Sequence, residues 1–97
     1  MSRFARRIDN NHAEVRDVCR TIPGMEVEDV HALPTGIGDL FLHYRPGGDG
    51  AWCWCEVKSK GGKQTELQLA AQARWGEHYL LARDIDDILI YFGLLVG

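Results

Sequence analysis

The fold is decided by residues 39–58, which read DLFLHYRPGGDGAWCWCEVK. Leu40, Leu42 and Tyr44 alternate with their neighbours at the period of two that is typical of a strand. The stretch 46–50, PGGDG, predicts a turn, and residues 51–58 predict a second strand. Together they predict an antiparallel hairpin, in which the start of one strand lies beside the end of the other.

The flanking segments predict further elements around this hairpin. Asp9 or Asn10 is a suitable N-cap for a helix that continues to Ile22. Thr65 and Gln68 have the spacing of a capping box, and Gly76 is a typical helix end. The expected order is helix (9–22), strand (25–31), the hairpin (39–58), helix (65–75), strand (78–83) and a last helix capped by Asp84. This αβββαβα order indicates an α/β (α+β) domain, a small mixed sheet flanked by helices.

Composition limits the classes of protein that this chain can belong to. Its 97 residues, 45% apolar and 26% charged, are typical of one soluble globular domain, residues 1–97. The longest apolar run, 88–96, is interrupted by Gly93 and is shorter than the roughly 20 residues of a membrane span. No hydrophobic stretch follows the basic N-terminus, so we expect no signal peptide. Three cysteines predict no disulfide framework, and we expect a cytoplasmic protein.

The distribution of charge along the chain is more informative about binding partners than the net charge. The formal net charge is −3, which argues against a non-specific nucleic-acid binder. Residues 1–20 nevertheless carry five Arg against three acids, and residues 51–76 carry four basic residues against two acids. If the fold brings these two segments together, they form a basic face on an acidic protein.

The hairpin also predicts a cluster of chemically active side chains. Glu56 and Lys58 lie on one face of a strand, and the antiparallel pairing brings Asp39 towards them. Two carboxylates close together favour a cation between them, and oxygen ligands suit Mg²⁺ or Mn²⁺. Such an ion polarises a phosphate and activates water, while Lys58 holds that water or a phosphate oxygen. We expect these side chains to serve a site rather than the core. The alternative is an ordinary surface ion pair.

Other candidate residues have two interpretations each. Glu14 is either a third ligand that reaches the sheet or a solvated helix residue. Trp52 and Trp54 either stack on the unpaired bases of a nucleic acid or pack under the first helix, and we favour the packing. We interpret the three cysteines as small core residues rather than ligands of structural zinc. The apolar segment 89–96 predicts a homodimer interface.

At this point the chain resembles a known family. Gly38-Asp39 followed by Glu56-Val57-Lys58 resembles the signature of the PD-(D/E)XK nuclease superfamily, and the predicted element order matches its restriction-endonuclease-like core. The resemblance is greatest to its VRR-NUC and Holliday-junction-resolvase-like branch, which includes small phage and prophage nucleases. Residues 9–15 resemble the helix motif of those proteins, and the similarity extends over residues 7–90. One departure is Gly38, where the family usually has proline.

The resemblance implies a metal-dependent endodeoxyribonuclease that acts on branched or structured DNA such as Holliday junctions. It implies that Asp39, Glu56 and the carbonyl of Val57 are metal ligands, with Glu14 as a further ligand. Lys58 would orient the attacking water. Gln68 would be the family's accessory glutamine, unless it only caps its helix or Gln72 takes that role.

The expected DNA contacts and the alternative function follow from the same interpretation. The residues that would follow the DNA backbone are Arg3, Arg6, Arg7, Lys60 and Lys63. The expected partners are DNA and a second copy of the chain, with no membrane, in the host cytoplasm if the protein is phage-encoded. The alternative is a catalytically weak DNA-binding or homodimeric assembly module with the same fold.

Overall fold

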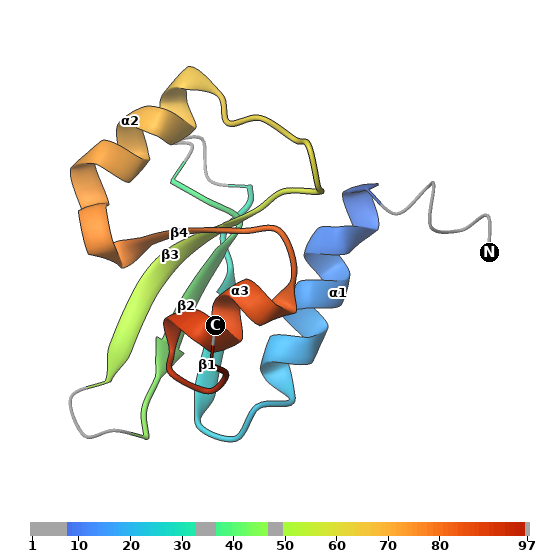
Figure 1. Cartoon of the computed structure of the whole chain (residues 1–97), viewed down its shortest axis with the longest axis vertical. Coiled ribbons are helices and arrows are strands. Elements are labelled where there is room, and N and C mark those ends of the chain that lie inside the picture. Colours follow the sequence, from blue (N-terminus) through green and yellow to red (C-terminus); the bar gives the residue numbers. More distant parts are fainter. Residues whose placement is uncertain (1–7, 33–36, 47–49, 97) are drawn as a thin grey trace.

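The architecture was obtained as a computed structural model, which describes residues 8–32, 37–46 and 50–96. The described elements are α1 (Ile8–Arg20), β1 (Met25–Asp29), β2 (Leu40–Tyr44), β3 (Ala51–Val57), α2 (Glu66–Trp75), a short 3₁₀ helix η2 (Gly76–His78), β4 (Tyr79–Ala82) and α3 (Ile85–Tyr91). This order confirms the predicted αβββαβα arrangement and adds η2 (Figure 1).

The four strands form one mixed sheet in the order β1-β2-β3-β4. Neighbours β1, β2 and β3 are antiparallel, whereas β4 runs parallel to β3. A parallel neighbour needs a long crossover, and the segment that contains α2 supplies it. The predicted hairpin is confirmed, with Leu40 opposite Cys55 and Tyr44 opposite Ala51.

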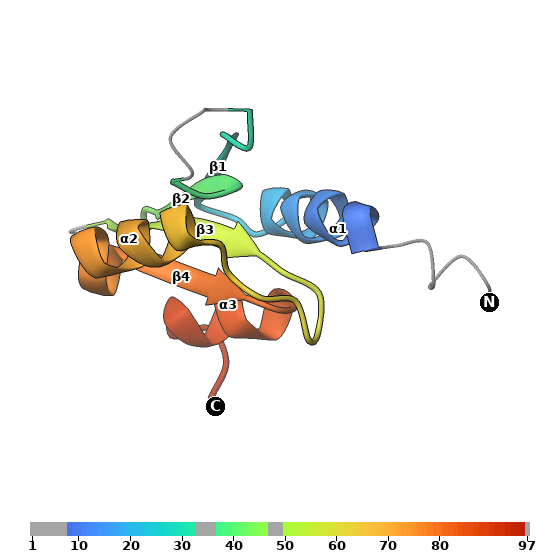
Figure 2. The same cartoon turned by 90° about the horizontal axis from the view of Figure 1, so that it is seen from above.

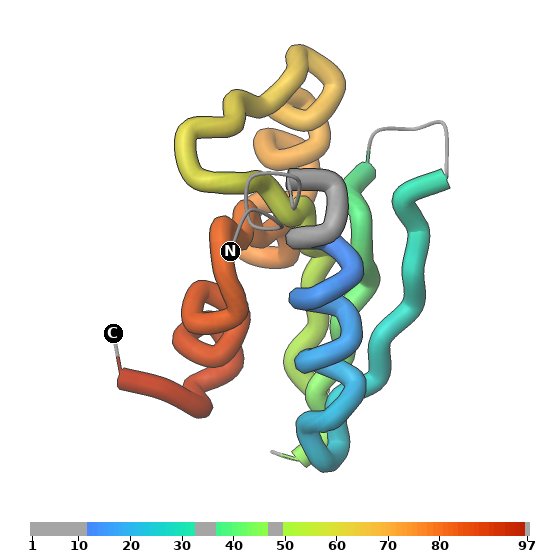
Figure 3. The backbone as a smooth tube through the Cα atoms, turned by 90° about the vertical axis from the view of Figure 1, so that its right-hand side faces the viewer, coloured from blue at the N-terminus to red at the C-terminus, as the bar shows by residue number. Residues whose placement is uncertain are grey.

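The hydrophobic core lies between one face of the sheet and two helices. α1 and α3 contact each other on this face, and Figure 3 shows them side by side. Val15 and Cys19 from α1 and Ile88 from α3 pack against Leu40, Leu42, Cys53, Cys55, Val57 and Ala82 from the strands. All three cysteines are wholly buried free thiols, which confirms their interpretation as core residues.

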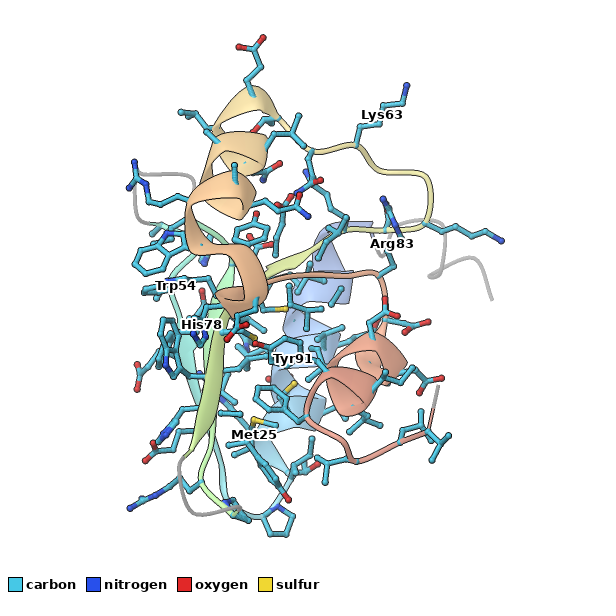
Figure 4. The ribbon with its side chains drawn as sticks, turned by 60° about the vertical axis from the view of Figure 1, so that its left-hand side comes forward. Met25, Trp54, Lys63, His78, Arg83 and Tyr91 are labelled. Carbon is cyan, nitrogen blue, oxygen red and sulfur yellow. The ribbon has the colours of Figure 1, made fainter. Side chains whose placement is uncertain are left out.

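The opposite face of the sheet carries α2 and an aromatic cluster. Trp75 from α2 lies edge-on to Trp52 and Trp54, at ring-centre distances of 6.2 and 5.7 Å. His78 stacks flat on Trp52 at 4.0 Å. Figure 4 shows Trp54 and His78 on the side of α2, and Met25 and Tyr91 on the opposite side. The prediction that the tryptophans pack under the first helix is therefore wrong, because their place in β3 turns them away from α1.

Local interactions set the ends of the helices. The Thr65–Gln68 capping box is present, and the Asp84 carboxylate accepts a hydrogen bond from the amide of Asp87 at the start of α3. The first helix ends at Arg20, two residues before the predicted end, where backbone hydrogen bonds form a turn. β1 ends at Asp29 rather than His31, because the Asp29 carboxylate accepts the His31 amide and bends the chain.

Two surface features bear on partners. Within the described ranges, no helix is long and apolar enough to cross a membrane. The C-terminal part of the chain exposes apolar side chains: Ile90, Leu94, Leu95 and Val96. This exposed group is the surface that the homodimer prediction would use.

Candidate functional site

The structure brings Asp39, Glu56 and Lys58 together at the end of the hairpin. The amide of Asp39 donates to the carbonyl of Cys55 at 2.8 Å, which continues the β2–β3 pairing by one residue. The Asp39 side chain then accepts a hydrogen bond from the amide of Val57 through Oδ2, at 2.7 Å. Lys58 Nζ lies 3.4 Å from Glu56 Oε2. Asp39 therefore lies against the end of β3, and Lys58 pairs with Glu56 on the same strand end.

Glu56 is the most unusual member of this group because it is wholly buried. Its Oε1 accepts a hydrogen bond from the hydroxyl of Tyr79, and Lys58 lies over its other oxygen. Among the described residues, Oε2 has no hydrogen bond. The expectation that Glu56 serves a site and not the core is therefore wrong in part, because its removal also disturbs buried packing.

Tyr79 was missed by sequence reasoning, although it is the direct partner of Glu56. Burial raises the pKa of the Tyr79 hydroxyl, and the neighbouring Glu56 carboxylate raises it further, while Gln64 lowers it. Tyr79 therefore remains a hydrogen-bond donor at neutral pH. The parallel register sets Tyr79 opposite Trp54, on the face that Glu56 shares, and no local pattern in the sequence gives this register.

Gly38, the residue before Asp39, has a backbone conformation that favours glycine. Its φ of +147° is a conformation that side chains rarely adopt, and proline is fixed near −65°. A Cβ at this position would also lie 3.0 Å from the carbonyl of Cys55, closer than normal packing allows. Glycine is therefore required here for Asp39 to reach the end of β3.

A cleft of about 510 Å³ opens beside this group. Its walls come from the N-terminal half of α1 and from the loop between β3 and α2, which lie near each other in Figure 2. Its lining residues are His12, His31, Asp39, Val57, Lys58, Ser59 and Gly62. Glu56 does not line the cleft and lies beneath Lys58 instead.

Arg83 fixes the loop that forms one wall of the cleft. Its guanidinium donates to the carbonyls of Ser59 and Gly62, at 2.8 and 2.9 Å. Figure 4 shows Arg83 beside this loop. Lys60 and Lys63 are on the same loop, and both are exposed. Arg3, Arg6 and Arg7 lie outside the described residues.

Besides Glu56, two other predicted catalytic or metal-binding residues do not line the cleft. Glu14 is exposed on α1, and His12, two residues earlier, lines the cleft instead. Gln68 uses its side-chain oxygen to accept the amide of Thr65 at 2.7 Å. This contact is the helix cap, which was one of the interpretations of Gln68 from the sequence. Gln68 is not among the residues that line the cleft.

These features define a small α+β protein with a polar cleft that is lined by one carboxylate, Asp39, and one lysine, Lys58, at a strand end. Comparison of the chain with protein-family models, with curated proteins and with solved structures finds no match. The functional argument therefore depends on the geometry of the site.

Proposed function

We propose that the protein is a metal-dependent endodeoxyribonuclease, which hydrolyses DNA phosphodiester bonds in this cleft and acts on branched or structured DNA. The observation that carries the proposal is that Asp39 and Lys58 line one cleft at the end of the hairpin, while the carboxylate of Glu56 lies beneath Lys58. Carboxylates and a lysine in this arrangement supply what phosphodiester hydrolysis needs: cation ligands and a positive group for the developing charge.

The donor set fits Mg²⁺ or Mn²⁺. Both ions prefer oxygen ligands, which Asp39, Glu56 and the Val57 carbonyl would provide. Glu56 Oε2 supports this fit, because it is a buried acceptor without a hydrogen bond among the described residues. A buried carboxylate oxygen without a hydrogen bond favours a nearby cation. In the structure this cation is the Lys58 ammonium, 3.4 Å away. Bound Mg²⁺ would supply charge neutralisation and an activated water.

The chain's own residues would divide the remaining tasks. Asp39 is held in place through Oδ2 by the Val57 amide, so its orientation is fixed before any substrate arrives. Lys58 is 24% exposed and lines the cleft, so its ammonium reaches both the buried Glu56 and a phosphate in the cleft. Tyr79 holds Glu56 from below through the other oxygen. Arg83 keeps the loop beside Lys58 in one conformation.

The test is Mg²⁺-dependent cleavage by the purified chain on linear, nicked, flapped and four-way DNA substrates. We expect cleavage that needs Mg²⁺ or Mn²⁺, and its loss in Asp39→Asn and in Lys58→Met. Asp39→Asn retains an oxygen that accepts the Val57 amide, so circular dichroism should show the folded state. Glu26→Gln, on the exposed edge strand β1, is the matched carboxylate control and should retain activity.

Binding without cleavage by the wild-type chain would contradict the proposal and favour the DNA-binding module instead. DNA affinity should fall steeply with salt, because phosphate contacts release counterions. The double change Lys60→Gln and Lys63→Gln should weaken binding to all substrates about equally and reduce the salt dependence. An unchanged affinity would exclude this loop from the DNA interface.

The expected homodimer is tested separately. Sedimentation equilibrium should give twice the chain mass of 10.9 kDa if the exposed C-terminal residues pair two copies. Leu94→Asp should then return the mass to one chain, because a charge on an apolar interface is costly. A monomeric wild-type chain would exclude the dimer and leave the nuclease proposal unaffected.

A further inference from the structure

Three side chains from different parts of the chain meet at the mouth of the cleft. His12 comes from α1, Asp29 from the end of β1, and His31 from the turn that follows it. One ligand atom from each lies within 4.8 Å of the other two. His12 and His31 also line the cleft of Asp39 and Lys58. The group is separate from those two residues, and the proposed hydrolysis does not use it.

We propose that His12, Asp29 and His31 form a second cation site, which takes a divalent transition metal ion such as Zn²⁺. Two imidazole nitrogens and one carboxylate oxygen are a common ligand set for such ions, whereas Mg²⁺ prefers oxygen alone. The site therefore differs in ligand chemistry from the oxygen-rich group of Asp39 and Glu56.

The distances suit this assignment after a small adjustment. Ligand atoms of a tetrahedral zinc site lie about 3.3 Å apart, given zinc–nitrogen bonds near 2.0 Å. His12 Nε2 is 3.6 Å from Asp29 Oδ2, which is close to that separation. His31 Nδ1 is 2.5 Å from Asp29 Oδ1, a hydrogen bond that an ion would replace. The His31 side chain is 59% exposed, so it has room to turn.

An independent observation comes from His12. Its Nε2 is buried, and among the described residues it has no hydrogen bond, although it is aimed at Asp29. A buried ring nitrogen without a hydrogen bond is costly, and coordination to a metal removes that cost. The His12 and His31 rings already lie edge to face, with their centres 5.2 Å apart.

Arg16 fixes the carboxylate of this group. Its guanidinium donates to Asp29 Oδ2 at 3.1 Å, and a carboxylate has lone pairs enough for a second partner. A hydrogen bond of this kind orients a ligating carboxylate. The positive charge of Arg16 also repels a cation, so we expect an affinity for the ion in the roughly micromolar range rather than a very tight one.

The chain would supply three ligands to this ion. Zinc sites with three protein ligands keep a fourth position for water or substrate. Because His12 and His31 line the cleft, this position faces the same space as Lys58. The natural fourth ligand is therefore an anionic oxygen, such as a phosphate oxygen, of whatever molecule occupies the cleft.

The test is calorimetric titration of the metal-free full-length chain with Zn²⁺, together with the visible absorption of bound Co²⁺. We expect one ion per chain, with affinity reduced at least about tenfold in His31→Ala and in Asp29→Asn. His43→Ala is the matched control, because His43 pairs with the Glu26 carboxylate at 2.7 Å as His31 does with Asp29. That variant should bind Zn²⁺ as the wild type does.

Lys58→Met separates this proposal from the proposed hydrolysis, because it should lose cleavage and keep Zn²⁺ affinity. Wild-type affinity in both His31→Ala and Asp29→Asn would overturn the site, as would the absence of saturable binding up to about 100 µM. A near-ultraviolet thiolate band from bound Co²⁺ would also overturn it, because the cysteines would then be the ligands.

Discussion

The hydroxyl of Tyr79 on β4 donates a hydrogen bond to the carboxylate of Glu56 on β3, the one charged side chain among the described residues that is wholly buried. Lys58 approaches the same carboxylate from the cleft side. Glu56 is therefore held between a neutral donor within the fold and a cation at the surface of the cleft. The first two predictions below separate these two contributions to stability.

Tyr79→Phe should lower the free energy of unfolding by about 1–3 kcal/mol, because it leaves a buried acceptor without its donor. Urea denaturation followed by circular dichroism measures the loss. Tyr91→Phe is the control, since the Tyr91 hydroxyl donates to the neutral carbonyl of Glu77 at 2.6 Å. It should cost about 1 kcal/mol. Equal losses in the two variants would mean that the charge of Glu56 adds nothing to its bond with Tyr79.

Lys58→Met should destabilise the fold by about 3 kcal/mol, because it leaves a buried carboxylate without its cation. Glu56→Gln removes the charge that Lys58 compensates. The double variant should therefore be more stable than the sum of the single losses predicts, by about 1–3 kcal/mol in a double-mutant cycle. Additive losses would show that Lys58 and Glu56 do not interact in solution.

Asp29 should make stability depend on pH in the acid range. Burial raises the pKa of Asp29, but hydrogen bonds from His31 and Arg16 outweigh it and hold the pKa well below its ordinary value. The unfolded chain therefore binds a proton first as the pH falls. The stabilisation is complete above about pH 5 and is lost progressively towards about pH 2.

Asp29→Asn tests this pH dependence through urea denaturation at pH 7, 5 and 3. The variant should lose less stability between pH 5 and pH 3 than the wild type does. Glu26→Gln is the control: a hydrogen bond from His43 lowers the pKa of Glu26 as well, but Glu26 is 52% exposed and its pairing is screened by water. Parallel curves for Asp29→Asn and the wild type would contradict the prediction.

The three cysteines should resist thiol reagents in the native protein. Burial raises the pKa of Cys19 to about 11 and that of Cys53 to about 12, and it raises the pKa of Cys55 well above its ordinary value. Little thiolate therefore exists at pH 8, and the side chains are also inaccessible. Ellman's reagent should titrate all three only after denaturation. Rapid reaction of the folded chain would show that the core opens readily.

Much of the fold was predictable because local signals agree with one another. Alternation in residues 39–58 and the Gly-rich turn specify the hairpin, and its register then fixes Asp39 against Val57. The capping residues correctly predicted both ends of α2 and the start of α3. The helix that covers the face of Trp52 and Trp54 was harder to predict, because the periodicity of a strand separates its two faces without showing which helix packs on each.

The site was predictable only where the hairpin alone determines it. Asp39, Glu56 and Lys58 all belong to one local unit, so their meeting follows from sequence spacing. Tyr79, Arg83 and His31 reach the site through pairings between distant segments, which no local pattern encodes. The burial of Glu56 has the same origin, since β4 pairs beside it and Tyr79 from β4 contacts its carboxylate.

The aromatic cluster gives this protein a built-in optical probe. All three tryptophans of the chain gather on the face that carries α2, and a histidine ring stacks on one of them. Their ultraviolet emission therefore reports on that single surface. Occupation of that face, and not of the cleft lined by His12 and Lys58, is the event to which fluorescence would respond most strongly.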